Sequence, residues 1–122
     1  MPRILIVDDE EHIRTLYKLE LEDDGYEVFT EDSGRDLSSK VARTAPDVVV
    51  LDIKMVDGSG LDALQELRDN FYDLPVILCS AYGSFKEDIK SYAADYYVVK
   101  SSDLTELKKR IGEALESHIP NS

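Results

Sequence analysis

The chain has 122 residues, of which 26 are acidic and 14 basic, so its formal net charge is −12. This length predicts a single domain over residues 1–122, with a core at about 3–117 and a frayed tail at 118–122. The acidic surface argues against direct binding to nucleic acid or a membrane, and no apolar run approaches the ~20 residues of a membrane span, so a cytoplasmic location is expected.

The first expected elements are a strand at residues 4–7 and an amphipathic helix at residues 10–24. The strand consists wholly of apolar residues, most of them β-branched, which is typical of a strand buried on both faces of a parallel sheet. The helix keeps apolar residues, among them Ile13 and Tyr17, at three- to four-residue spacing, and Gly25 supplies its C-terminal stop.

A second strand is expected around Val28 and Phe29. It is followed by a weaker helix over residues 34–44, which ends there because Pro46 disfavours helical geometry at the residue before it. A third, wholly apolar strand covers residues 48–51.

The next helix is expected at residues 59–70, with Ser59 as its N-cap. A fourth strand at 76–79 includes Cys79, the single cysteine of the chain, which rules out an internal disulfide and is expected to be a small buried hydrophobe.

The last third of the chain repeats the alternation. It predicts a short helix at residues 84–94, a strand at 96–99 and a helix at 103–117 that is capped by Ser102 or Asp103.

This alternation predicts an α/β fold of the (βα)5 type, a doubly wound parallel sheet between two helical layers. Five strands at this length favour the flavodoxin-like strand order 2-1-3-4-5 in a three-layer αβα arrangement.

Polar residues follow the apolar runs at the carboxyl ends of the strands, where open α/β sheets bind their ligands. The first strand is followed by Asp8 and Asp9, the third by Asp52, the fourth by Ser80 and the fifth by Lys100. Three carboxylates are therefore expected to meet at the point where the strand order reverses, beside a hydroxyl and an ammonium group.

Clustered carboxylates repel one another, and a hard cation removes this repulsion. The donor set contains oxygen alone, which favours Mg²⁺, or Mn²⁺, over Zn²⁺. Glu10 and Glu11 come directly after the acidic pair and add negative charge beside the crevice. The set suits a carboxylate nucleophile that takes up a phosphoryl group.

These positions resemble the receiver domain of two-component response regulators, and the resemblance extends from Arg3 to about Leu115. It implies that Asp52 is the phosphorylated residue. It further implies that Mg²⁺ is held by Asp8, Asp9 and Asp52 together with the backbone carbonyl of Lys54.

The resemblance also implies how the phosphoryl group is sensed. Ser80, Ala81 and Lys100 would contact it, and Tyr97 would be the aromatic switch that turns inward when Ser80 moves toward the phosphate. Ser101 stands where the family usually has a proline after the lysine, so the Lys100–Ser101 bond is expected to be trans.

Lys54 and Tyr82 lie two residues after Asp52 and Ser80, on the path by which water would reach the phosphoryl group. A bulky phenol would obstruct in-line attack, and a lysine offers no group to orient water. We therefore expect both residues to tune dephosphorylation and the phosphorylated form to be long-lived.

The implied role is a signalling domain and not an enzyme in the usual sense, because it catalyses only its own phosphorylation and dephosphorylation. Its implied partners are a histidine kinase or histidine phosphotransfer protein, with Arg14 and its neighbours as contact candidates. An output partner, or a second copy after phosphorylation, would bind the face formed by residues 84–94, 96–99 and 103–117. A single-domain regulator, a phosphorelay intermediate and part of a longer regulator all remain open.

Two other functions stay as alternatives. An aspartate-nucleophile phosphohydrolase resembling the haloacid dehalogenase type would place a DxD motif after the first strand, whereas Asp8, Asp9 and Glu10 are consecutive here. A flavodoxin-type FMN module would need a hydroxyl-rich loop at the same position.

Overall fold

The computed structural model of the chain describes residues 1–52, 60–80, 95–101 and 103–117. The helix expected at 84–94 therefore lies outside the described residues. The same holds for the tail at 118–122, and for Ser59 and Ser102 as capping residues.

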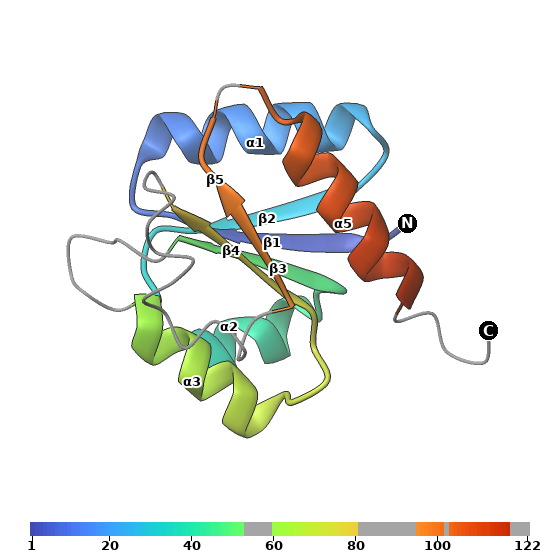
Figure 1. The fold of residues 1–122 in the computed structure, drawn as a ribbon. Coiled ribbons are helices and arrows are strands. Elements are labelled where there is room, and N and C mark those ends of the chain that lie inside the picture. Colours follow the sequence, from blue (N-terminus) through green and yellow to red (C-terminus); the bar gives the residue numbers. More distant parts are fainter. Residues whose placement is uncertain (53–59, 81–94, 102, 118–122) are drawn as a thin grey trace.

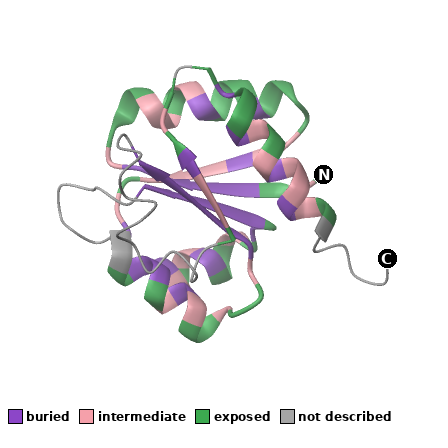
Figure 2. Cartoon of the chain, in the orientation of Figure 1, coloured by how far each residue is buried: buried purple, intermediate pink, exposed green. Residues whose placement is uncertain are grey.

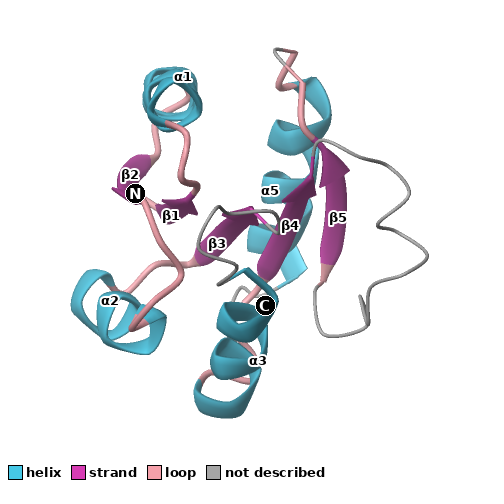
Figure 3. Cartoon of the chain, turned by 90° about the vertical axis from the view of Figure 1, so that its left-hand side faces the viewer, coloured by secondary structure: helices cyan, strands magenta, loops and turns pink. Residues whose placement is uncertain are grey.

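Five parallel strands form one sheet in the order β2-β1-β3-β4-β5, which confirms the predicted order (Figures 1 and 3). The strands are β1 (Arg3–Val7), β2 (Glu27–Glu31), β3 (Val48–Asp52), β4 (Val76–Ser80) and β5 (Tyr96–Val99). Their carboxyl ends share one edge of the sheet because all pairings are parallel. The order changes direction between β1 and β3, so a ligand site is expected at the carboxyl ends of these two strands.

Helices cover both faces of this sheet. The described helices are α1 (Glu11–Asp23), α2 (Leu37–Thr44), α3 (Gly60–Asn70) and α5 (Thr105–Ser117). α1 and α5 lie on one face, and α2 and α3 lie on the other (Figure 1). Among the described residues, no helix is both long and apolar enough to cross a membrane.

The sheet divides the apolar core into two layers. In β1, Ile4 and Ile6 pack in the layer beneath α1 and α5, whereas Leu5 and Val7 pack in the layer above α2 and α3. The other strands alternate in the same way because successive side chains of a strand point to opposite faces. The central strands β1, β3 and β4 are accordingly almost wholly buried, whereas most residues of the edge strands β2 and β5 are only partly buried. Figure 2 shows the exposed residues concentrated on the outer sides of the helices.

Helix α1 ends as predicted at Gly25, which has φ +98. The backbone N–H of Gly25 donates to the Glu22 carbonyl at 3.0 Å, and that of Tyr26 donates to the Leu21 carbonyl at 3.2 Å. These two bonds form a Schellman motif, in which the left-handed residue is usually glycine because a Cβ is unfavourable there.

Helix α2 begins three residues later than predicted, at Leu37 and not at residue 34. The predicted start was wrong because Asp36 adopts a left-handed conformation, φ 53, which an α-helix excludes. Asp36 does not cap the helix with its side chain. Instead, Glu66 of α3 accepts a hydrogen bond of 2.8 Å from the backbone N–H of Ser38.

The end of α2 follows the predicted signal, whereas the start of α5 differs from the prediction. Ala45, directly before Pro46, leaves the helical region with φ 49 while its N–H still donates to the Val41 carbonyl. At the start of α5, the Asp103 carboxylate accepts hydrogen bonds from both the backbone N–H and the hydroxyl of Thr105, at 3.0 and 2.6 Å. α5 begins at Thr105, two residues later than predicted, and Asp103 lies one residue before the N-cap position and holds the first helical residue through an i to i+2 side-chain bond.

A candidate phosphoryl-accepting site at the strand ends

Because side chains alternate along each strand, three predicted residues lie on the same face of the sheet at the carboxyl ends of their strands. Asp8, Asp52 and Lys100 continue the positions whose side chains face the layer of α1 and α5. Asp8 and Asp52 are each only 2% exposed, so two carboxylates are buried at the end of adjacent strands. Burial of two like charges requires a cation beside them.

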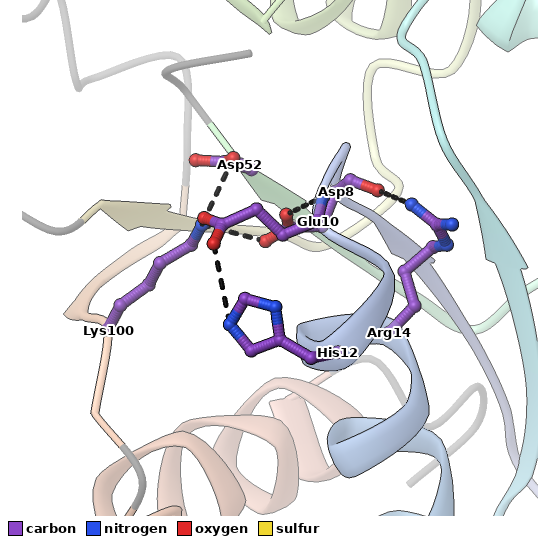
Figure 4. A network of polar contacts seen from close by, with 6 residues as sticks. All are labelled: Asp8, Glu10, His12, Arg14, Asp52 and Lys100. Carbon is purple, nitrogen blue, oxygen red and sulfur yellow. Dashed lines mark hydrogen bonds and ion pairs between the residues drawn. The ribbon is translucent and has the colours of Figure 1, made fainter. Parts of the chain in front are cut away.

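Lys100 is that cation among the described residues (Figure 4). Its Nζ lies 2.9 Å from Asp8 Oδ2, 3.1 Å from Asp52 Oδ2 and 3.2 Å from Glu10 Oε1. The Lys100 side chain is 11% exposed, so these ion pairs are shielded from water on most sides. Residues separated by up to 92 positions thus meet at one nitrogen.

The pKa of Lys100 reflects two opposing causes. Burial alone would lower it, because desolvation disfavours the ammonium form. The hydrogen bond and charge of Asp8, followed by the charge of Asp52, outweigh burial and raise the pKa above its ordinary value. Lys100 is therefore charged throughout the neutral range.

The loop between β1 and α1 is held in place by backbone contacts. The Asp8 N–H donates to the Glu31 carbonyl at 3.0 Å, and the Glu10 N–H donates to Asp8 Oδ1 at 2.9 Å. The Arg14 guanidinium donates to the Asp8 carbonyl at 2.7 Å (Figure 4). Arg14 thus supports the acidic loop from within the chain, and its contact with a kinase stays a prediction.

The carboxylates of Asp8, Asp9 and Glu10 have oxygens within 4.8 Å of one another. Asp52 is not part of this group but faces it across Lys100. Such an oxygen-only set, partly buried and strongly negative, matches the donors that Mg²⁺ prefers. The residues present therefore fit the predicted cation.

Sequence reasoning placed Glu10 and Glu11 beside the crevice without distinguishing them. The structure separates the two, because Glu10 contacts Lys100 whereas Glu11, which begins α1, is not among the ion-pair partners of Lys100 in the described part of the chain. The only signal in the sequence was the position of Glu10 at the strand-to-helix junction, and this does not reveal where its side chain points.

Ser80 and Tyr97 lie toward the opposite side, that of α2 and α3. Ser80 ends β4 and is fully buried, and Tyr97 of β5 packs partly buried against the apolar layer there. The Tyr97 hydroxyl is buried without a well-formed hydrogen bond among the described residues. Burial raises its pKa, while the nearby Ser80 hydroxyl opposes this rise. The two predicted switch residues are therefore neighbours.

Beneath the site lies the thiol of Cys79, fully buried and unpaired as predicted. Burial raises the pKa of this thiol to about 12, although the charge of Lys100 opposes the rise. Burial likewise raises the pKa of Tyr17, whose phenol belongs to the same layer. Both groups stay neutral under the acidic cluster.

Several predicted positions fall elsewhere. Lys54, Ala81 and Tyr82 lie outside the described residues. The Lys100–Ser101 bond lies within them and is trans, as expected. A cavity of about 960 Å³ at the amino ends of the strands, lined among others by Pro46 and Pro75, contains none of the predicted site residues.

Comparison with known proteins agrees with this geometry. A family model described as the response regulator receiver domain matches residues 4–112. Regulatory protein AtoC of Escherichia coli is 36% identical over 116 residues, which are 93% of this chain and 25% of AtoC. Response regulator MprA of Mycolicibacterium vanbaalenii is 34% identical over 121 residues, which are 98% of this chain and 52% of MprA. The chain thus spans about half or less of these curated relatives.

Solved structures show the same similarity. Response regulator TrrA of Thermotoga maritima, in complex with Mg²⁺–BeF, is 43% identical, with a TM-score of 0.88 over 94% of this chain and 100% of TrrA. TrrA in complex with the histidine kinase ThkA aligns with a TM-score of 0.86, 43% identity and coverage of 94% and 99%. A CheY-like receiver protein of Methanospirillum hungatei is 28% identical, with a TM-score of 0.87 and coverage of 96% and 95%.

Proposed function

The chain belongs to the receiver domain family of response regulators, and from this premise we propose that it accepts a phosphoryl group on Asp52 and signals the change to a partner protein. The observation that carries the proposal is the buried Asp52 carboxylate at the end of β3, 3.1 Å from the ammonium of Lys100. A carboxylate held in a dry site beside a fixed cation is suited to take up a phosphoryl group.

In the proposed reaction, an Asp52 carboxylate oxygen forms a bond to the phosphorus of the donor. The bond between phosphorus and the donor breaks, and its electron pair leaves with the donor group. The donor is the phosphohistidine of a histidine kinase or histidine phosphotransfer protein, protonated on the ring nitrogen that does not carry phosphorus, so that its imidazole leaves neutral. Lys100 offers its positive charge to the phosphoryl oxygens, which carry the negative charge during transfer.

Asp8, Asp9 and Asp52, with the backbone carbonyl of Lys54, are the residues proposed to hold Mg²⁺, or Mn²⁺. When bound, the ion supplies charge neutralisation for the phosphoryl oxygens. The complex of TrrA with Mg²⁺–BeF supports this part of the proposal. So does the donor chemistry of the acidic cluster, whose carboxylate oxygens lie within 4.8 Å of one another.

The proposed signal runs from Asp52 to β5. Ser80 and Ala81 would turn toward the phosphoryl group, and Tyr97 would fill the space that Ser80 leaves. The outer surface of β5 and α5 carries an ordered cluster, in which Arg110 lies 5.9 Å from the ring centre of Tyr96 and pairs with Glu113 at 2.7 Å. We assign the output partner, or a phosphorylation-dependent second copy, to this surface.

The kinase contact is proposed at the exposed side of α1, near the acidic loop. The solved complex of TrrA with the histidine kinase ThkA supports a kinase as partner. The proposal includes a cytoplasmic location, which suits the unpaired thiol of Cys79. It also includes that the chain catalyses only its own phosphorylation and dephosphorylation.

The test is labelling of the purified chain with ³²P-acetyl phosphate and Mg²⁺. We expect an acid-stable, base-labile label. It should not form when EDTA removes the Mg²⁺, and it should not form in Asp52→Asn. Asp69→Asn, an exposed position on α3, is the matched control and should label like the wild type. Label retained in Asp52→Asn would contradict the assignment, and turnover of a small phosphoester by the wild type would favour a phosphohydrolase.

A further inference from the structure

Glu10 occupies the N-cap position of α1 but does not cap the helix. Its backbone is extended, its carbonyl accepts hydrogen bonds from the N–H groups of Ile13 and Arg14, and its side chain makes no capping bond. Serine, threonine, aspartate and asparagine are the usual N-cap residues, and glutamate is not. The carboxylate of Glu10 points away from the N-terminal N–H groups of α1 and toward the end of β5.

There it meets Lys100, as Figure 4 shows. Glu10 Oε1 lies 3.2 Å from Lys100 Nζ, and Glu10 Oε2 lies 3.4 Å from Nε2 of His12, so both oxygens are oriented. An ammonium group has three N–H donors. Asp8, Asp52 and Glu10 are three acceptors at hydrogen-bonding distance from it, so every donor of Lys100 already faces a carboxylate.

We propose that Glu10 is a positioning residue whose carboxylate binds the Lys100 ammonium in the metal-free, unphosphorylated chain. It would compete with the incoming phosphoryl group for this ammonium. The inference rests on the proposed function at Asp52. Of the three partners, Glu10 is the one at the surface, with 48% of its side chain exposed against 3% for Asp8 and 2% for Asp52. Water replaces its contact most easily, so it is the partner that Lys100 gives up when a phosphoryl oxygen arrives.

The first experiment uses the metal-free chain without a phosphoryl donor. The ¹³Cε and ¹⁵Nζ signals of Lys100 are recorded by nuclear magnetic resonance in the wild type, Glu10→Gln and Glu11→Gln. Glu11→Gln removes the same charge one residue further along and is the matched control. We expect the Lys100 signals to shift in Glu10→Gln and to stay in place in Glu11→Gln. Equal spectra for the two variants would overturn the proposal.

The second experiment measures the initial rate of labelling by acetyl phosphate at saturating Mg²⁺ and fixed ionic strength. We expect Glu10→Gln to be labelled about two to five times faster than the wild type, the range that an exposed ion pair contributes. Glu11→Gln should show a smaller change. A Glu10→Gln rate equal to that of Glu11→Gln, or slower than the wild type, would overturn the competition.

The two proposals fail in different ways. If the wild type is not labelled on Asp52, the proposed function fails, and the metal-free spectra still decide whether Glu10 holds Lys100. If the wild type is labelled and the two glutamine variants behave alike, the function stands and the role of Glu10 is wrong.

Discussion

At the scale of single residues, the charges of the site depend on one another. Asp8 and Asp52 are buried, and Lys100 is their shared counter-ion. Removing one member of a buried ion pair leaves an uncompensated charge, which typically costs about 3–5 kcal/mol. Under the proposed function, Lys100 has to exchange one oxygen partner for another on phosphorylation without leaving the two buried carboxylates uncompensated.

The buried thiol of Cys79 gives a prediction for alkaline pH. Its pKa is raised to about 12 by burial, so the folded chain keeps this proton at a pH where the unfolded chain releases it. The contribution of Cys79 to the free energy of unfolding is therefore complete below the unfolded pKa of ~8.5. Above that pH it falls by up to about 1.4 kcal/mol per pH unit.

Urea unfolding at several pH values between 8 and 9.5 measures this fall. Lys100, Lys108, Tyr17 and Tyr97 also have raised pKa values, but their unfolded forms titrate mainly near pH 10 and above, so the thiol makes the largest contribution in this window. In Cys79→Ala the slope should flatten. A wild-type stability that stays level up to pH 9.5 would contradict the prediction.

Residue pattern alone was enough to bring Asp8, Asp52 and Lys100 together, because the carboxyl ends of parallel strands converge at one edge. It was not enough for Glu10, whose contact depends on a side-chain rotamer and on a partner ninety positions away. Local spacing carries no information about such a contact.

At the scale of elements, the helix ends show which signals are readable from sequence. Gly25 and Pro46 were sufficient to place the ends of α1 and α2, since each acts on the backbone beside it. The start of α2 was predicted wrongly because Asp36 is left-handed, and the N–H group of Ser38 in the first turn donates to Glu66 of another helix. A cap supplied from a distant segment leaves no mark on the sequence around the helix it serves.

Gly25 and Gly112 offer a matched pair of glycine substitutions. A Cβ at either position meets no atom within 4 Å, so only backbone conformation distinguishes them. Gly25→Ala should destabilise the chain by about 1–2 kcal/mol, because φ +98 is unfavourable for an L-residue. Gly112→Ala, inside α5, should stabilise it by about 0.5–1 kcal/mol. Thermal unfolding of both variants measures the signs, and a Gly25→Ala variant as stable as the wild type would contradict the role of the Schellman motif.

At the scale of the whole molecule, the net charge of −12 acts on stability through self-repulsion. Part of that charge is concentrated where Asp8, Asp9 and Glu10 meet at the end of β1. Divalent cations that bind this group in the folded chain alone will therefore stabilise it by mass action.

We expect Mg²⁺ to raise the free energy of unfolding by about 2.7 kcal/mol at a concentration one hundred times its dissociation constant. Denaturation at constant ionic strength, with NaCl replacing MgCl₂, separates this binding from general screening. Asp9→Asn should lose most of the gain, whereas Asp69→Asn should keep it. A gain of equal size in NaCl would show that screening alone is responsible.

The division of the core by the sheet has a consequence for how related sequences vary. Ile4 and Ile111 pack in one layer, and Leu5 and Leu67 pack in the other, although Ile4 and Leu5 are neighbours in the chain. A change in side-chain volume can be compensated only by residues that touch the same space. In each strand, the residues that face α1 and α5 should therefore show substitutions correlated with those helices. The alternate residues, which face α2 and α3, should show substitutions correlated with the other two helices. The side chains of the two core layers can then change independently in evolution, although both layers are attached to the same sheet.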